Sequence, residues 1–152
     1  MIAYLVIFGP AVAFLIGGYV AADRPETRWP LLWMVAAVAS AAWLAYVALV
    51  PFEEGGKTFF GMNPAVDGDS LLFWVPLLTA IPCAVAGYLN AAKPLAIGAA
   101  GIVGPLLLAY PTTPRGDGDG LWSLIFLALP FFGLLLTFVA SLGKFAGLAR
   151  RA

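Results

Sequence analysis

Residues 71–111 read LLFWVPLLTAIPCAVAGYLNAA, then Lys93, then PLAIGAAGIVGPLLLAYP, so two uncharged stretches flank a single charge. The first, Leu71–Ala92, has 22 residues, and the second, Pro94–Pro111, has 18. The hydrocarbon core of a bilayer is about 30 Å thick, and a helix needs roughly 20 residues to cross it. Both stretches are therefore long enough to span a membrane, the second only just.

Three further uncharged stretches of similar length complete the pattern: Ile2–Ala22, Pro30–Val50 and Leu121–Leu142. Because lipid offers the backbone no hydrogen-bond partner, a crossing segment must be a helix or a strand of a closed barrel. The five stretches lack the alternation of barrel strands. The sequence therefore predicts an all-α, polytopic membrane protein, with residues 1–152 forming a single transmembrane domain of five helices.

The composition excludes several classes of protein. Hydrophobic residues make up 62% of the chain and charged residues 11%, with a mean hydropathy of +0.97, whereas soluble domains carry about a quarter charged residues. Eight basic residues balance eight acidic ones, so no net charge attracts nucleic acid. There is no histidine and one cysteine, which excludes an internal disulfide and imidazole chemistry.

The basic residues set the expected orientation, because cytoplasmic loops of membrane proteins are rich in Lys and Arg. With five crossings, Lys57 and Arg115 lie on one side, and the other side receives Arg24, Arg28, Lys93, Lys144, Arg150 and Arg151. If Pro94–Pro111 were a re-entrant segment, the split would be four against four. The bias favours five crossings of the cell membrane, with the N-terminus outside and the C-terminus in the cytoplasm.

Small residues at helical spacing indicate how these helices pack, because helices associate in lipid by close backbone approach. They form three series: Ala37, Ala41, Ala45 and Ala48; Ala80, Ala84, Gly87 and Ala91; and Gly98, Gly101 and Gly104. We expect the second, third and fourth spans to form the tight centre of the bundle. The first and fifth spans, rich in large apolar residues, are expected to lie outside.

Prolines interrupt four of the five spans, and each removes a backbone donor and predicts a bend. They are Pro10, Pro76, Pro82, Pro105 and Pro130. Thr79 lies between two of these prolines, so its hydroxyl is expected to bond a carbonyl that a proline leaves without its usual donor.

The spans contain no ionisable residue of the kind that marks proton relays and ion paths. Cys83 lies in mid-span without an adjacent base, and a thiol there behaves as a small apolar side chain. We therefore expect neither a catalytic residue nor a cofactor, and the chain is not expected to be an enzyme.

The two predicted outer loops carry the remaining polar and apolar motifs. Asp67, Asp69, Asp117 and Asp119 alternate with glycine, which suits either a weak Ca²⁺ site or solvated turns. Phe59, Phe60 and Met62 form an apolar patch that predicts burial in the membrane interface, capping of the helix bundle or docking on a partner.

Two functions remain open from these observations. The first is a non-catalytic accessory or assembly subunit of a larger membrane complex, or a homo-oligomeric scaffold, with membrane lipids and other membrane subunits or itself as partners. The alternative is a passive channel or carrier for a neutral or lipidic solute, through the bent helices around Thr79 and Pro105.

Overall fold

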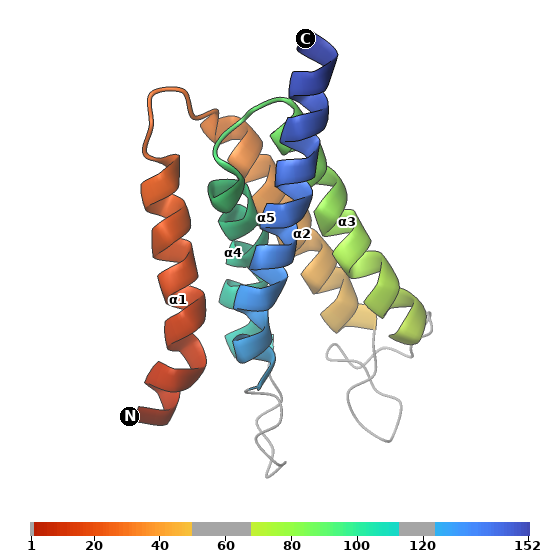
Figure 1. Cartoon of the computed structure of the whole chain (residues 1–152). Coiled ribbons are helices and arrows are strands. Elements are labelled where there is room, and N and C mark those ends of the chain that lie inside the picture. The colour runs from red at the N-terminus through yellow and green to blue at the C-terminus, as the bar shows by residue number, and fades with distance from the viewer. Residues whose placement is uncertain (1, 50–67, 113–123) are drawn as a thin grey trace.

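The computed structural model describes residues 2–49, 68–112 and 124–152. Within these ranges the chain has no strand and forms five helices: α1 (Ile2–Ala22), α2 (Trp29–Leu49), α3 (Gly68–Tyr88), α4 (Pro94–Thr112) and α5 (Leu124–Arg151). The predicted all-α class is confirmed for these residues. Figure 1 shows the helices running alternately up and down, with the N- and C-termini at opposite ends of the bundle.

Three of the helices are long and apolar enough to cross a membrane. Their qualifying segments are Leu5–Ala22, Trp29–Leu49 and Phe126–Arg151. Helices α3 and α4 contribute the shorter apolar segments Phe73–Tyr88 and Pro94–Leu108. The described part of the chain is thus built for association with a membrane.

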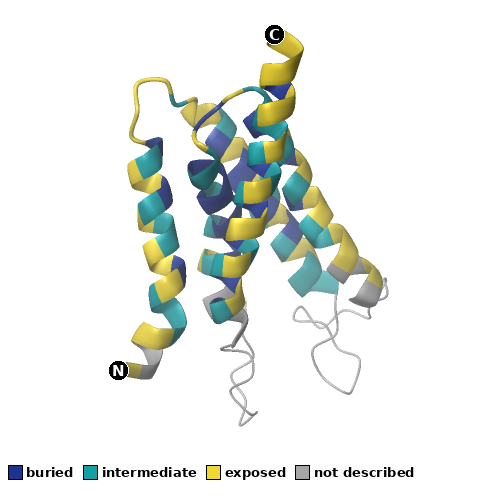
Figure 2. Ribbon diagram, in the orientation of Figure 1, coloured by how far each residue is buried: buried dark blue, intermediate teal, exposed yellow. Residues whose placement is uncertain are grey.

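The outer faces of the helices are apolar, which suits the same environment. Phe131 and Phe145 are each 74% exposed and Leu107 is 69% exposed. In Figure 2 the buried residues gather on the inner faces and the exposed ones line the outer faces of every helix. Lipid chains can cover such side chains without the cost that water would impose.

Helix α3 ends earlier than the predicted span Leu71–Ala92. Its last residue is Tyr88, and Asn90 adopts a left-handed backbone conformation with φ 53°. The N–H of Asn90 donates to the carbonyl of Gly87, and that of Ala91 donates to the carbonyl of Ala86, both over 2.9 Å. This pair of bonds is a Schellman motif, which satisfies the last carbonyls of the helix. Asparagine tolerates the conformation better than most residues.

The turn after α3 is joined to the connection between α1 and α2. The backbone N–H of Arg28 donates to the carbonyl oxygen of Ala91 over 2.7 Å. Proline occupies the first turn of both helices that start here, at Pro30 in α2 and Pro94 in α4, where its missing N–H costs no intrahelical bond. One end of the bundle is therefore closed by two hydrogen-bonded connections.

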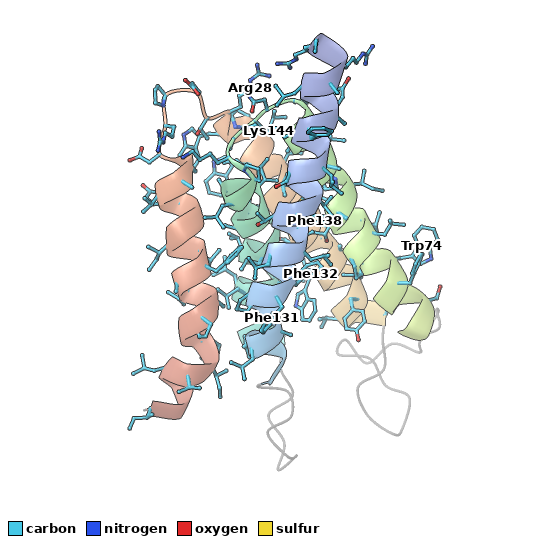
Figure 3. All side chains as sticks on the ribbon, in the orientation of Figure 1. Arg28, Trp74, Phe131, Phe132, Phe138 and Lys144 are labelled. Atoms are coloured by element: carbon cyan, nitrogen blue, oxygen red, sulfur yellow. The ribbon has the colours of Figure 1, made fainter. Side chains whose placement is uncertain are left out.

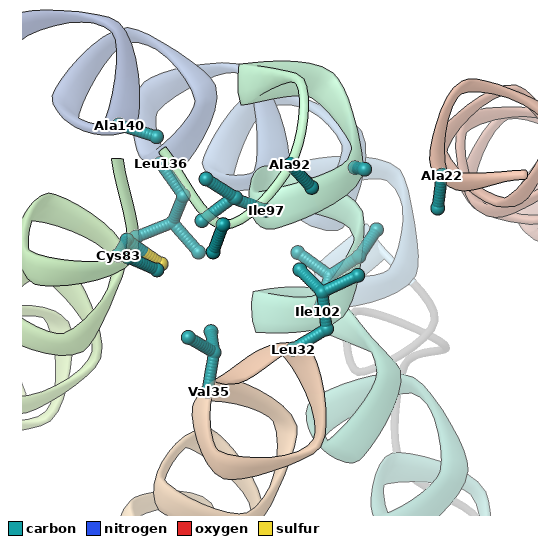
Figure 4. Packing of buried hydrophobic residues seen from close by; sticks show 12 residues of the cluster. Ala22, Leu32, Val35, Cys83, Ala92, Ile97, Ile102, Leu136 and Ala140 are labelled. Carbon is teal, nitrogen blue, oxygen red and sulfur yellow. The ribbon is translucent and has the colours of Figure 1, made fainter. Parts of the chain in front are cut away.

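The core lies between the helices and is built from small residues with a few larger ones. Among its almost fully buried members the largest apolar ones are Ile97, Ile102, Leu136 and Val35, each at most 1% exposed. Figure 4 shows these side chains converging with Cys83 from α2, α3, α4 and α5. Most of the other buried positions are alanines, so the backbones approach closely.

Helix α5 is central, and the expectation that it lies outside is wrong. It packs along α3 and α4 and also contacts α1, whereas α3 and α4 touch each other only slightly. The close packing of α5 depends on a series of small residues: Gly133, Thr137, Ala140, Gly143 and Gly147. The last two lie beyond the predicted span Leu121–Leu142, so the series was incomplete there. The helix also continues beyond Leu142 to Arg151.

Glycines place α3 and α5 in backbone contact. A Cβ atom at Gly87 would overlap the carbonyl of Ala140, and one at Gly143 would overlap the carbonyl of Ala84. Nearer the C-terminal end of α5, in the same seam between α3 and α5, a Cβ at Gly147 would overlap the carbonyl of Tyr88. Because the obstructing atoms are backbone, no side-chain rotation can make room at these positions.

The glycines of α4 face two different helices. A Cβ at Gly98 would overlap Thr137, and one at Gly101 would overlap Leu136, both in α5. A Cβ at Gly104 would instead overlap Ser40 of α2. These three residues therefore hold α4 against α5 on one side and against α2 on the other.

Helix α2 packs through a different face from the one predicted. Ala37, Ala41 and Ala45 are exposed, while the buried residues are Leu32, Val35, Ala36, Ala39 and Ala42. Helix α2 carries alanines on all of its faces, so the spacing of alanines alone could not distinguish the packed face from the exposed one. The prediction of a seam through Ala37, Ala41 and Ala45 is wrong.

Candidate functional site

A cavity of about 200 Å³ lies among α2, α3, α4 and α5. It is lined by Ala39, Trp43, Tyr46, Val75, Pro76, Thr79, Pro105, Ala128, Leu129 and Phe132. An engineered apolar cavity of about 150 Å³ is large enough to bind benzene. This cavity can therefore hold a small molecule or part of a larger one.

Trp43 lines this cavity, and its indole carries a polar atom that lacks a partner. Its Nε1 atom is buried and makes no hydrogen bond, the single such case among side chains in the part of the chain that the structure describes. The ring stacks on Tyr46, with centroids 5.6 Å apart and planes at 24°. A buried donor without an acceptor costs about 1–3 kcal/mol, so an acceptor near Nε1 would be stabilising.

Besides Trp43 and Tyr46, the lining contains the polar residue Thr79, which is 2% exposed. Its hydroxyl donates to the carbonyl oxygen of Val75 over 2.9 Å. The carbonyls that lose a donor to Pro76 and Pro82 are four residues earlier, at Leu72 and Leu78. The expectation that Thr79 bonds a carbonyl freed by a proline is therefore wrong, and its hydroxyl satisfies its own helix.

The cavity is neutral and mostly apolar. Its lining contains neither a carboxylate nor a basic side chain. Cys83 is buried elsewhere, near Gly101 and Leu136. Within the described ranges no three His, Cys, Asp or Glu residues come together as a group that could hold a metal ion. The arrangement offers shape and mostly apolar walls, with Trp43, Tyr46 and Thr79 as its polar residues.

A second hollow, a groove of about 320 Å³, runs between α1, α2 and α4. Its walls come from Leu15, Gly18, Tyr19, Ala22, Trp29, Leu32, Trp33, Ala36, Ala96, Ala99, Ala100 and Val103. Tyr19 of α1 and Trp29 of α2 contact each other at one end, with ring centroids 6.2 Å apart.

Six basic residues gather at the end of the bundle where this groove begins. They are Arg24, Arg28, Lys93, Lys144, Arg150 and Arg151. Figure 3 shows Arg28 and Lys144 at this end, and Arg150 Nη1 donates to the hydroxyl of Tyr88 over 2.8 Å. Two acidic residues, Asp23 and Glu26, share the connection between α1 and α2. We name this region the basic end.

Several predicted site residues lie outside the described residues. Phe59, Phe60 and Met62 fall in residues 50–67, as does Asp67, and the segment 113–123 contains Asp117 and Asp119. Asp69 belongs to the first turn of α3, but its side chain is not described. Ala80 lies partly buried against the core. Of the other predicted packing residues, five lie at helix contacts: Ala84, Gly87, Gly98, Gly101 and Gly104.

Sequence reasoning missed Trp43, although a signal was present. It lies six residues before the last residue of α2, about 9 Å along the helix axis, which is deeper than the usual interfacial position of tryptophan. An indole at that depth needs a hydrogen-bond partner or a ligand.

Comparison of the chain with protein-family models, curated proteins and solved structures gave no match.

Proposed function

We propose that the chain is a five-pass membrane protein with its N-terminus outside and its C-terminus in the cytoplasm. The alternating course of the helices supports this arrangement, because it brings the six residues of the basic end to one side. Helix α3 has 21 residues and α4 has 19, which correspond to about 31 and 28 Å. Both lengths are near the thickness of the hydrocarbon core.

We further propose that the protein is a non-catalytic, passive carrier that binds a small neutral or lipidic molecule between its helices. The observation that carries this function is an apolar cavity lined by Trp43, a residue whose buried Nε1 donor has no partner in the described part of the protein. A carbonyl, ether or hydroxyl oxygen of the ligand would accept its hydrogen bond. The remaining walls would contact the apolar part of the ligand.

Two probes of similar shape test this binding site. Cyclohexanone carries an acceptor oxygen and methylcyclohexane does not. With the protein in liposomes and protein-free liposomes as the blank, we expect Trp43→Phe to weaken the binding of cyclohexanone about fivefold, the effect of one net hydrogen bond, and to leave the binding of methylcyclohexane nearly unchanged. Trp33→Phe, at a tryptophan that is 68% exposed, should leave the binding of both probes unchanged. An equal effect of Trp43→Phe on the two probes would refute the proposed site.

Carriage is tested separately from binding. Proteoliposomes loaded with glycerol should release it faster than protein-free liposomes loaded in the same way. Phe132→Trp, which fills the cavity, should slow the release. If glycerol is released at the rate of protein-free liposomes while binding of cyclohexanone depends on Trp43, the protein binds the molecule without carrying it, and the carrier function is refuted.

An accessory or scaffold subunit is the second candidate, and one feature of α5 favours it. Phe131, Phe138 and Phe145 are 74%, 59% and 74% exposed and follow a seven-residue spacing, which places them on one helix face. Native mass measurement in mild detergent should then give a species heavier than the 15.9 kDa chain. Phe138→Ala combined with Phe145→Ala should reduce the amount of this heavier species relative to the monomer. A lone monomer in several detergents would contradict this function.

A further inference from the structure

The groove between α1, α2 and α4 ends in a cation on each of its three walls. Arg24 follows the end of α1, Arg28 precedes the start of α2, and Lys93 precedes the start of α4. The backbone bond from Arg28 to Ala91 holds the first two of these chain segments beside the third. The cations thus meet at the same end of the groove.

These cations are available to an external anion. Arg24, Arg28 and Lys93 are exposed, and so are Asp23 and Glu26 in the same region. Among the described residues none of the five forms an ion pair. The basic side chains outnumber the acidic ones here, and Lys144, Arg150 and Arg151 of α5 add to the positive potential of the same end.

The body of the groove is apolar and open along its side. Its floor is formed by small residues of α4, Ala96, Ala99 and Ala100, and its rim by the exposed rings of Tyr19 and Trp33. Aromatic rings of this kind favour the headgroup level of a bilayer. An extended hydrocarbon chain fits such a floor and can enter from the surrounding lipid.

We propose that this groove binds one anionic phospholipid, with an acyl chain along α4 and the phosphate at Arg24, Arg28 and Lys93. Charge complementarity identifies the occupant, because basic pockets between membrane helices recognise anionic headgroups. The apolar length of the groove then selects a lipid over a free phosphate. The inference rests on the membrane location of the chain and is independent of the cavity at Trp43.

The test compares binding of palmitoyl-oleoyl phosphatidylglycerol and the matching phosphatidylcholine by native mass measurement of the full chain. We expect the anionic lipid to bind more tightly. Arg24→Gln combined with Arg28→Gln should weaken it about 30-fold, from about fivefold for each cation near the membrane surface. Glutamine at residue 28 retains the backbone N–H that bonds Ala91.

A matched control removes two cations from the same end but away from the groove. Lys144→Gln combined with Arg151→Gln should reduce binding of phosphatidylglycerol several-fold less than the change at the two arginines. Equal losses in the two double variants would show attraction by diffuse surface charge and overturn the proposal.

Two further experiments distinguish a bound lipid from a bound free phosphate. Val103→Phe and, as a smaller change, Ala100→Leu fill the groove and should each weaken phosphatidylglycerol binding while the arginines remain. Inorganic phosphate at millimolar concentration should not displace the lipid. Unchanged lipid binding by both groove variants, or full displacement by phosphate, would refute the seated acyl chain.

Discussion

The backbone N–H of Arg28 donates a 2.7 Å hydrogen bond to the carbonyl oxygen of Ala91, which joins the connection after α1 to the turn after α3. Ala91 is positioned by the Schellman motif that places Asn90 in a left-handed conformation. A backbone contact therefore fixes two of the three chain segments that form the basic end. This geometry does not depend on which side chain occupies residue 28.

The first prediction concerns topology. In a Cys83→Ala background, Lys93→Cys and Arg115→Cys should react with a membrane-impermeant thiol reagent from opposite sides, because α4 separates them in a five-pass chain. Arg24→Cys is the control and should react from the same side as Lys93→Cys. Labelling of the variants at residues 93 and 115 from one compartment would exclude five crossings.

The second prediction concerns the seam between α3 and α5. Gly87→Ala should destabilise the protein by about 1–3 kcal/mol, because the new Cβ would overlap the carbonyl of Ala140. Gly9→Ala makes the same change in α1, where nothing lies within 4 Å of the new atom. It should be neutral or stabilise the helix by up to about 1 kcal/mol. Unfolding midpoints in detergent compare the two, and equal midpoints would contradict the seam.

The third prediction couples α2 to α4. Gly104→Ala should be destabilising, because its Cβ would overlap Ser40. Ser40→Gly should recover part of the loss, with a coupling of about 0.5–3 kcal/mol in a double-mutant cycle. The Ser40→Gly single variant is the control, since it loses the hydroxyl bond to the carbonyl of Ala36. Strictly additive effects would show that the two residues do not touch.

The fourth prediction concerns the last turns of α5. Gly147→Leu should separate them from α3, since its side chain would overlap the carbonyl of Tyr88. Amide hydrogen exchange at residues 148–151 should then become faster. Ala149→Leu is the matched control, because Ala149 is exposed and its replacement should leave exchange unchanged. Arg150→Gln should have a small effect, as its bond to Tyr88 is exposed.

The existence of the helices could be predicted because lipid allows so few backbone structures. Uncharged stretches of the right length must be helical, and prolines at residues 30 and 94 mark two helix starts to within one residue. The end of α3 could not be placed from apolarity, because Leu89, Ala91 and Ala92 suit a helix. The conformation of Asn90 decides it.

The packing could be predicted only where small residues have large neighbours. Gly98, Gly101 and Gly104 stand out in α4, and the structure places all three at helix contacts. In α2 alanines occur on every face, so the face that packs was not evident. A helix in lipid has no polar side to identify its outer surface.

The cavity at Trp43 and the groove below the basic end were beyond the sequence. Each is formed by residues from three or four helices, and its volume depends on how far those helices stand apart. The sequence predicts that a solute path would pass Thr79 and Pro105, and the structure brings both residues to one cavity. Whether that cavity carries a solute stays a prediction.

The three glycine contacts between α3 and α5 also restrict motion. Gly87, Gly143 and Gly147 each face a carbonyl of the other helix, so sliding by a fraction of a turn would drive larger side chains against the backbone. Packed helices with such contacts change register in whole turns or remain still. Helices α3 and α5 are therefore expected to keep their register and to move as one unit.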